Sequence, residues 1–314
     1  MAKEGRIEGI VPAALTPFHE GDGSIHEADL ERHFEYLLGT PGVTGIAVNG
    51  HAGEVSSLTR DEQALVLEVA RRAVDDSQWL IAGVYAHSSA EARECAVAAT
   101  EAGADALLIF PPEIWEFGLA DDPRLAYGYY EEIARASELP LIAFVYPHWS
   151  PVHLSADVVL ELCHRVPSIA AVKDWSNDLV AYERTLRNLR AEHPGVSMLS
   201  SYSRGLAASL AVGADGILSG HGSLIPELQA RLFAQATDGD LEGMRETAAV
   251  LFELTQVFYA APIADGFTRM KHAAVALGRL SSGRVRPPLL PLSAEAAARV
   301  ERVLPLLSER AAHA

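Results

Sequence analysis

The sequence has only two cysteines, Cys95 and Cys163, and neither has the spacing of a metal ligand. Neither a disulfide framework nor a zinc site is therefore indicated, and we expect both cysteines in the core. No apolar run approaches the roughly 18 residues that a membrane-spanning helix needs, and the N-terminus lacks the apolar core of a signal peptide. We therefore expect no membrane partner and a cytoplasmic location.

Basic residues are also scarce: 25 Lys and Arg stand against 42 Asp and Glu, which gives a net charge of −17 at pH 7. Nucleic acids and anionic membranes bind basic surfaces, so this balance argues against nucleic acid as a partner. Hydrophobic residues make up 49% of the 314 residues, and charged residues make up 21%. These proportions are typical of a globular protein with a large core.

Short β-type runs alternate with amphipathic helical stretches through the first two thirds of the chain. We predict eight strands, at residues 9–15, 43–49, 79–85, 106–110, 141–146, 169–173, 196–200 and 216–219. Helices are predicted between them, for instance at residues 59–74, 88–102, 125–136, 155–164 and 179–190. After the last strand the pattern is helical only, at residues 227–237, 241–259, 267–277 and 294–307.

Eight strands that alternate with helices predict an α/β fold, a closed (β/α)8 TIM barrel with a C-terminal helical extension. An open, doubly wound sheet is the alternative. We expect residues 1–225 to form the barrel core. Residues 226–314 would then form the barrel-closing helix and the extension, within a single structural unit.

The predicted strand near residues 168–174 is an apolar run whose last inward position is Lys173. A run this apolar is typical of a strand buried on both faces. Lysine is rarely buried without a partner or a task, because desolvation disfavours its ammonium form and lowers its pKa. Lys173 is therefore a candidate amine nucleophile, able to form a Schiff base with a carbonyl substrate. The alternative is a lysine just beyond the strand, paired with Asp174 and reaching water.

Barrels of this kind place their active sites at the carboxyl ends of the strands. The candidate positions are therefore 16, 49–54, 85–87, 111–113, 146–149, 173–175, 200–203 and 219–222. From the last two segments we take Ser201 and Ser219 as substrate-binding candidates. The strand-end histidines form no i, i+4 pair, so we predict no metal site.

Four stretches of the chain resemble a known family. They are Val11-Pro-Ala-Ala-Leu-Thr-Pro-Phe18, Asn49-Gly-His-Ala-Gly-Glu54, Phe144-Val-Tyr-Pro147 and the strand with Lys173. In combination they look like the dihydrodipicolinate synthase and N-acetylneuraminate lyase family of class I aldolases. The resemblance implies a β/α barrel, usually a homotetramer, and a Schiff base between Lys173 and the keto carbon of a 2-oxo acid, usually pyruvate. It implies no metal and no organic cofactor, because the protonated imine is itself the electron sink.

The chain departs from this family at several positions of the site. The family's loop usually reads Gly-Thr-Thr-Gly-Glu, where both threonines serve the substrate carboxylate and a proton relay; here it is Gly50-His-Ala-Gly-Glu54. The tyrosine that shuttles protons beside the imine corresponds to Phe144. A second tyrosine, offered to a neighbouring subunit in part of the family, aligns with Glu113, and an arginine for a second carboxylate falls near Trp149. The 2-keto-3-deoxygluconate aldolase branch has a further tyrosine, which is kept here as Tyr146.

A phenylalanine cannot relay a proton, so another group near Lys173 has to do so. His51 is the first candidate, since a histidine titrates near neutrality and this one lies on a glycine-flanked loop; alternatively, it is hydrogen-bonded as part of the structure. Tyr146 shares a strand face with Phe144, and its alternative role is packing. For Glu113 we favour a solvent or subunit contact over a catalytic role. We keep it among the substrate-binding candidates, together with Phe144 and Trp149.

With both threonine hydroxyls absent, we expect backbone N–H groups near His51 and Ala52, on the turn that starts at Gly50, to hold the substrate carboxylate. Glu54 is expected to accept backbone N–H bonds and to fix its own loop. Three tryptophans follow predicted strands: Trp115, Trp149 and Trp175. If they share the mouth, they suit an aromatic or otherwise bulky substrate; subunit packing is the alternative.

We therefore predict a class I aldolase or lyase that acts through Lys173 on a small 2-oxo acid or a related carbonyl compound. One alternative is a hydratase, dehydratase or deaminase that uses the same imine without cleaving a carbon–carbon bond. A catalytically silent member that binds a carbonyl ligand or serves assembly is the other. From the resemblance we expect a homo-oligomer, either a tetramer or a dimer.

Overall fold

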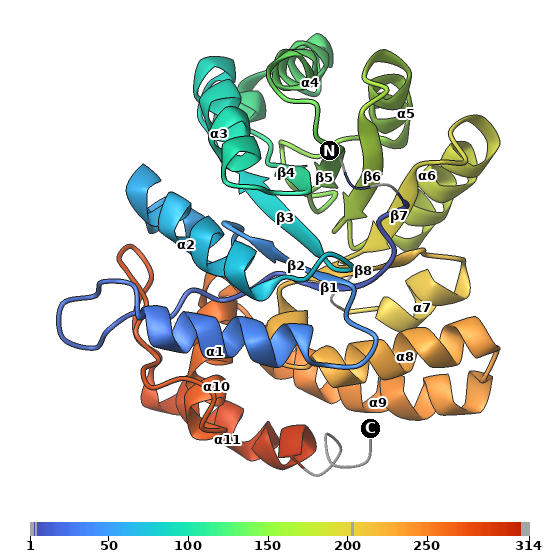
Figure 1. Cartoon of the computed structure of the whole chain (residues 1–314). Coiled ribbons are helices and arrows are strands. Elements are labelled where there is room, and N and C mark those ends of the chain that lie inside the picture. The colour runs from blue at the N-terminus through green and yellow to red at the C-terminus, as the bar shows by residue number, and fades with distance from the viewer. Residues whose placement is uncertain (1–2, 4, 202–203, 309–314) are drawn as a thin grey trace.

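The structure is a computed structural model that describes residue 3 and residues 5–201 and 204–308. These residues form eight parallel strands: β1 (Gly9–Pro12), β2 (Gly45–Val48), β3 (Trp79–Val84), β4 (Ala106–Ile109), β5 (Leu141–Val145), β6 (Ile169–Asp174), β7 (Ser197–Ser200) and β8 (Gly216–Ser219). They pair in the order β1-β8-β7-β6-β5-β4-β3-β2, and parallel bridges from Ile10 to Val43 and from Ala13 to Ala47 join β1 to β2. The predicted closed barrel is thus confirmed, and the open sheet is not found (Figure 1).

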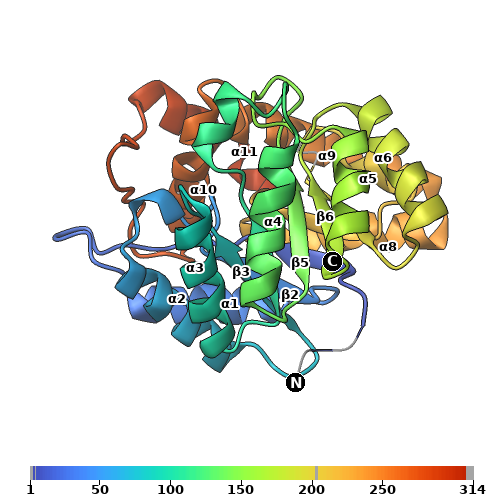
Figure 2. The same ribbon diagram turned by 90° about the horizontal axis from the view of Figure 1, so that it is seen from above.

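The helices that follow the strands surround the barrel. They are α1 (Glu27–Leu38), α2 (Arg60–Ala73), α3 (Ser89–Glu101), α4 (Arg124–Ala136), α5 (Ala156–Arg165), α6 (Leu179–Glu192), α7 (Leu206–Ala211) and α8 (Pro226–Asp238). In Figure 2, α3, α4 and α5 lie in front of the strands and run alongside them. The predicted elements are present, although strand β1 ends three residues before the predicted boundary.

Three more helices form the C-terminal extension: α9 (Leu241–Phe258), α10 (Gly266–Ala276) and α11 (Ala294–Ser308). They lie together on one side of the barrel, with α9 next to α8 (Figure 1). Among the described residues, no single helix is long and apolar enough to cross a membrane. The segments Leu241–Phe258 and Ile263–Ala276 meet the criteria of length and composition only together, as a pair bent by 112°.

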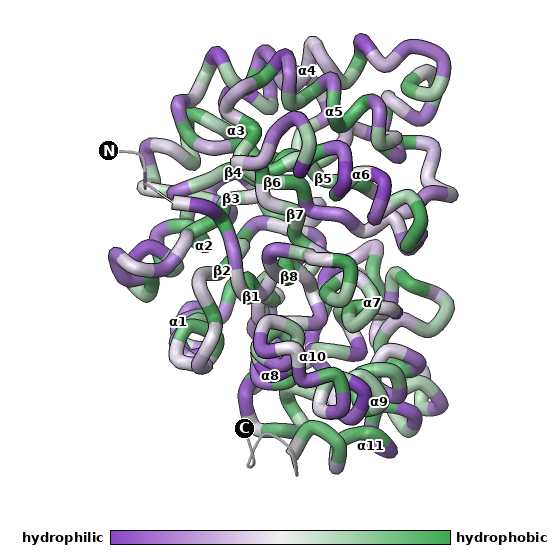
Figure 3. The backbone as a smooth tube through the Cα atoms, turned by 90° about the vertical axis from the view of Figure 1, so that its right-hand side faces the viewer, coloured by the Kyte–Doolittle hydropathy of each residue, from purple (hydrophilic) through white to green (hydrophobic). Residues whose placement is uncertain are grey.

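Side-chain caps fix where several of the outer helices begin. The Thr59 side chain accepts a hydrogen bond from the Glu62 backbone, and the Glu62 carboxylate accepts one from the Thr59 backbone, which completes the predicted capping box. The side chains of Ser88 and Ser155 cap α3 and α5, each by accepting one backbone hydrogen bond and without the reciprocal bond of the capping box. The chain in Figure 3 changes between hydrophilic and hydrophobic along these helices, as amphipathic helices do.

Alternation along the strands decides which side chains point into the barrel. In β5, Ala143 packs with the outer helices, whereas Ile142 and Phe144 belong to the core inside the barrel. In β6, Ala171 lies inside the barrel, so Lys173, two residues further on, also points inward. Lys173 is the register partner of Phe144 on β5, and the two side chains therefore lie side by side at the barrel mouth.

Candidate active site

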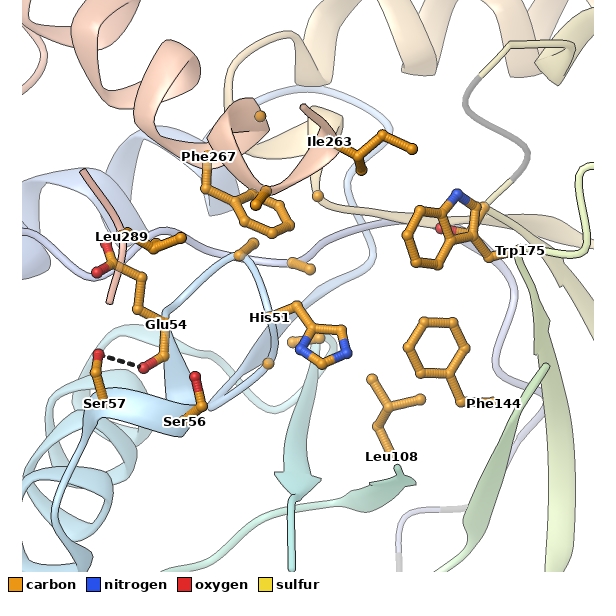
Figure 4. A pocket seen from close by; sticks show the side chains of 18 of the residues that line it. His51, Glu54, Ser56, Ser57, Leu108, Phe144, Trp175, Ile263, Phe267 and Leu289 are labelled. Atoms are coloured by element: carbon orange, nitrogen blue, oxygen red, sulfur yellow. Dashed lines mark hydrogen bonds between the residues drawn. The ribbon is translucent and has the colours of Figure 1, made fainter. Parts of the chain in front are cut away.

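A cavity of about 300 Å³ lies at the carboxyl ends of the strands. One side is lined by the loop after β2, which includes His51, and by inward residues of β5 and β6, Phe144 and Lys173. The C-terminal extension lines the other side with Phe267 and Leu289, which Figure 4 shows above the imidazole of His51. The cavity is therefore built jointly by the barrel and the extension.

Lys173 is only 6% exposed, and its Nζ lies 4.1 Å from the centre of the Phe144 ring. No carboxylate of the described residues lies within ion-pair distance of this amine, and burial lowers the pKa of Lys173 to about 7. Asp174 points away from it and accepts a hydrogen bond of 2.7 Å from the Ser176 backbone N–H. The alternative of a solvated lysine paired with Asp174 is therefore wrong.

The neighbouring side chains join into one aromatic cluster at the end of β5. Nε2 of His51 lies 2.5 Å from the Tyr146 hydroxyl, a short hydrogen-bond distance. The ring centre of Phe144 lies 4.7 Å from that of Tyr146, and that of Phe110 lies 4.7 Å from that of His51. The structure thus holds the histidine and the tyrosine as a bonded pair next to the lysine.

Burial changes the acid–base properties of this pair. It lowers the pKa of His51 to about 3, and the positive charge of Lys173 acts in the same direction. Burial raises the pKa of Tyr146 well above its ordinary value. The expectation that His51 titrates near neutrality is therefore wrong for the protein without substrate. Both groups are neutral at pH 7, because the imidazolium and the phenolate would each be poorly solvated.

The loop that carries His51 has a constrained backbone. Asn49 and Glu54, at its two ends, have φ angles of 53° and 56°, in the left-handed region. A side chain on Gly83 would clash with the loop, because its Cβ would lie 2.0 Å from the Asn49 carbonyl oxygen. Such conformations cost free energy and persist where the surroundings impose them, often at active sites. Glycine on β3 is thus required for the loop to approach the barrel.

Glu54 ties this loop to the C-terminal extension. Its Oε1 accepts a hydrogen bond of 2.5 Å from Lys271 of α10, and its Oε2 accepts one of 2.9 Å from the backbone N–H of Arg286. The cations of Lys271 and Arg286 lie 4.1 and 4.3 Å from the centre of the Phe18 ring. Glu54 thus accepts a backbone N–H bond, as expected. Both of its partners, however, come from a segment more than 200 residues away, so it joins its loop to that segment.

Six of the predicted site residues line the cavity: Gly50, His51, Ala52, Phe144, Lys173 and Ser201. Tyr146 does not line the cavity itself, but its hydroxyl is hydrogen-bonded to His51, which does. The predicted strand-end positions Tyr202 and Ser203 lie outside the described residues.

Three predicted substrate-binding residues lie elsewhere. Glu113 is exposed on the short 3₁₀-helix Glu113–Phe117, and Trp149 is 56% exposed. Ser219 is buried, and its hydroxyl oxygen accepts hydrogen bonds from Gln229 Nε2 at 2.8 Å and from the Gly222 backbone at 3.2 Å. Within a single chain none of the three lines the cavity, because two face outward and the third is used by the fold.

Of the three tryptophans, only Trp175 lines the cavity. Trp115 is buried in the outer core, where its ring meets that of Tyr129 edge-on at 5.4 Å. The sequence did not predict that Phe267 and Leu289 line the cavity or that Lys271 bonds to Glu54. One signal was available for Lys271, because the chain has only three lysines, the third being Lys3.

The described residues contain no group of three or more His, Cys, Asp or Glu side chains that could hold a metal ion. The reactive groups at the mouth are an amine, an imidazole and a phenol. A parallel barrel with a low-pKa lysine at its strand ends has the architecture of a lyase or aldolase that uses an amine nucleophile.

The chain belongs to the dihydrodipicolinate synthetase family, whose sequence profile matches residues 6–306. It is therefore an enzyme of a lyase and aldolase family, which makes or breaks carbon–carbon bonds.

Similarity to individual relatives extends over nearly the whole chain. A 4-hydroxy-tetrahydrodipicolinate synthase from Methanothrix thermoacetophila is 29% identical over 304 residues, covering 96% of this chain and 98% of that protein. The probable 2-dehydro-3-deoxy-D-pentonate aldolase YjhH of Escherichia coli (strain K12) is 26% identical, with coverages of 95% and 97%. YagE, a prophage protein of the same family from E. coli K12 solved in complex with pyruvate, superposes with a TM-score of 0.87 at 25% identity, with coverages of 96% and 99%.

The lowered pKa of Lys173 predicts a distinctive pH dependence. Reductive methylation with formaldehyde and cyanoborohydride, read by peptide mass spectrometry, should speed up at Lys173 as pH rises to about 7 and then level off. Free Nα-acetyl-lysine, with a pKa of about 10.4, should still gain nearly tenfold per pH unit between pH 7 and 9. A Lys173 rate that follows free lysine over this range would contradict the assigned pKa.

The buried pair of Glu54 and Lys271 predicts a large stability effect. Lys271→Met leaves the Glu54 carboxylate buried without its cation, so the free energy of unfolding should fall by about 3–5 kcal/mol in denaturant titrations. Glu54→Leu in the same background should recover part of this loss. As a control, Arg93→Met breaks an exposed ion pair with Glu132 and should have a much smaller effect. Equal losses for Lys271→Met and Arg93→Met would contradict the importance of the buried pair.

Proposed function

We propose that this enzyme is a class I aldolase or lyase that forms a Schiff base between Lys173 and the keto carbon of a 2-oxo acid. The observation that carries the proposal is the buried amine without a carboxylate partner among the described residues, with a pKa of about 7. A large fraction of this amine is uncharged and nucleophilic at neutral pH. A silent, ligand-binding protein would have no need to hold a lysine in this state.

Pyruvate is the 2-oxo acid that we propose, and the complex of YagE with pyruvate supports it. In the proposed reaction, Lys173 Nζ adds to the keto carbon, water leaves, and a protonated imine forms. The imine withdraws electrons from the neighbouring C3 carbon. C3 can then lose a proton, or a bond from C3 to another carbon can break, and either step gives an enamine. In the opposite direction, the enamine forms a new bond from C3 to another carbon. The imine itself is the electron sink, so we expect no metal or organic cofactor.

We assign the substrate carboxylate to the turn of the His51 loop. Gly53 and Val55 donate backbone hydrogen bonds to the Gly50 carbonyl at 3.0 and 3.2 Å. The backbone N–H groups of His51 and Ala52 have no acceptor among the described residues and belong to cavity-lining residues. Adjacent unused N–H groups in a turn are a favourable anion site, which supports this assignment.

We assign proton transfer to the pair of His51 and Tyr146, in place of the tyrosine that the family resemblance would put at Phe144. A neutral imidazole can accept a proton through Nε2, which lies 2.5 Å from the Tyr146 hydroxyl. A substrate carboxylate on the loop would raise the pKa of His51, because an opposite charge favours the imidazolium. The pair would thus become a better base when the substrate is bound.

We also propose that the chain forms a homo-oligomer, a dimer or a tetramer, and that it acts in the cytoplasm. Four large apolar side chains are 56–78% exposed after three neighbouring strands, β4, β5 and β6: Ile114, Phe117, Trp149 and Val180. Exposed apolar groups that border one face are typical of protein interfaces. Sedimentation that finds only monomer at micromolar concentration would contradict the oligomer.

The imine predicts a covalent adduct. Incubation with pyruvate and borohydride should add the mass of reduced pyruvate to the peptide that contains Lys173. Lys173→Arg should abolish the adduct and keep the fold, since arginine retains the charge and cannot deprotonate to attack. Lys3→Arg, the same change outside the cavity, should keep the adduct. No adduct with pyruvate or with larger 2-oxo acids would rule out the imine mechanism.

The assignment of His51 predicts a slower proton transfer in His51→Ala. Enamine formation exchanges the methyl protons of pyruvate with D2O, which NMR follows without knowledge of the second substrate. The exchange rate should fall by about 10²–10⁴-fold, the usual contribution of a general acid or base. Borohydride trapping at Lys173 should persist at a lower rate, and Phe144→Tyr in the same background should restore part of the exchange. An unchanged exchange rate in His51→Ala would show that His51 does not transfer the proton, and Tyr146 or water would then be the candidate for this step.

A further inference from the structure

The half of the cavity formed by the extension is mostly apolar. Ile263 comes from the turn before α10, Phe267 from the start of α10, and Leu289 from the connector to α11. Figure 4 shows Phe267 and Leu289 across the cavity from Phe144 and Trp175, with Ile263 above Trp175. We infer that the second substrate, which joins the enamine or leaves from it, is an aldehyde with an apolar, ring-sized substituent. This inference rests on the proposed Schiff-base function.

The polar groups of the same walls are largely used by the protein itself. Glu54 bonds to Lys271 and to the Arg286 backbone, and the Arg286 guanidinium bonds to Glu62 at 2.5 Å. The Ser57 hydroxyl donates to the Glu54 carbonyl at 2.9 Å, the bond drawn in Figure 4. The charged side chains at the rim are therefore not available as partners for a polyhydroxylated substrate.

A hydroxyaldehyde in this cavity would lose water from its hydroxyl groups and would meet fewer partners than it has in water, although the Ser56 hydroxyl is one of them. Buried polar groups without hydrogen bonds are unfavourable, whereas an apolar group gains from the same walls. The nearby rings of Phe144 and Trp175 lie 6.4 Å apart with planes 27° from parallel, and they offer faces and edges against which an aromatic ring can pack. The walls therefore select against sugar-like aldehydes and in favour of aromatic ones.

The size of the cavity limits the aldehyde. A volume of about 300 Å³ is at the lower end of the range for small-molecule sites. It must hold the pyruvate unit on Lys173 as well, which leaves room for about one ring. Benzaldehyde is a suitable probe of this class.

The chemical step follows from the enamine. Its C3 carbon attacks the aldehyde carbon and forms the new carbon–carbon bond, while the C=O π electrons move to the aldehyde oxygen, which takes up a proton. Water then hydrolyses the imine and releases a 4-aryl-4-hydroxy-2-oxo acid, with Lys173 restored as the amine. Cleavage is the reverse sequence, and neither direction needs an oxidant or a reductant.

The test compares aldehydes with the intact enzyme and pyruvate. We expect kcat/KM for benzaldehyde to exceed that for D-glyceraldehyde and D-erythrose by about 10²-fold, the discrimination typical of an apolar pocket. Benzaldehyde is the less reactive electrophile in solution, so such a preference reports on the protein. Equal or better use of the hydroxyaldehydes, or no turnover of any aldehyde, would overturn the inference. In either case, detection of the pyruvate adduct at Lys173 would still support the Schiff-base function. Absence of the adduct would rule out both the Schiff-base function and the aldehyde inference.

Two phenylalanine variants locate the preference. Phe267→Ala should lower the ratio of kcat/KM for benzaldehyde over glyceraldehyde by about tenfold, because it removes an apolar wall. Phe252→Ala deletes the same side chain at a 54% exposed position of α9, outside the cavity, and should leave the ratio unchanged. If Phe267→Ala also leaves the ratio unchanged, the extension does not select the aldehyde and the inference is wrong.

Discussion

The site depends on one physical constraint, the burial of the Lys173 amine without an opposite charge among the described residues. An ammonium group in such surroundings is poorly solvated, and its pKa falls to about 7. The same burial, together with the charge of Lys173, keeps His51 neutral. In the mechanism that we propose, this burial makes Lys173 the nucleophile and its neighbour His51 a neutral proton acceptor.

Lys271 is also buried, but among the described residues it, unlike Lys173, forms an ion pair with a carboxylate, that of Glu54. There a carboxylate lies 2.5 Å from the amine, and the pair joins the His51 loop to α10. Glu54 also offsets the burial of Lys271, whose pKa falls only to about 8. Of these two buried lysines, the paired one joins the His51 loop to α10. The one without a carboxylate partner among the described residues is the one to which we assign the chemistry.

The barrel and the position of Lys173 could be predicted because they depend on local patterns. Strand alternation places Phe144 and Lys173 on the inner face, and that alternation is present in the sequence. The pKa of His51 could not be predicted, since it depends on burial that only the assembled fold creates. Ser219 looked available at a strand end, but Gln229 of the following helix reaches its hydroxyl.

The apolar wall could not be predicted for a related reason. Phe267 and Leu289 lie far along the chain from the strands, and only the folding of the extension over the barrel brings them to the mouth. The three tryptophans predicted an apolar mouth, yet of these Trp175 alone lines the cavity, and the extension adds Ile263, Phe267 and Leu289. Long-range packing therefore builds the apolar wall to which we assign specificity, while the local strand pattern places the residues to which we assign the reaction.

The most direct test of this account is a crystal structure of the enzyme soaked with pyruvate and reduced with borohydride. The Schiff-base mechanism predicts continuous electron density from Lys173 Nζ to the former keto carbon, with the carboxylate within hydrogen-bond distance of the backbone N–H groups of His51 and Ala52. Pyruvate bound elsewhere, with Lys173 unmodified, would contradict it.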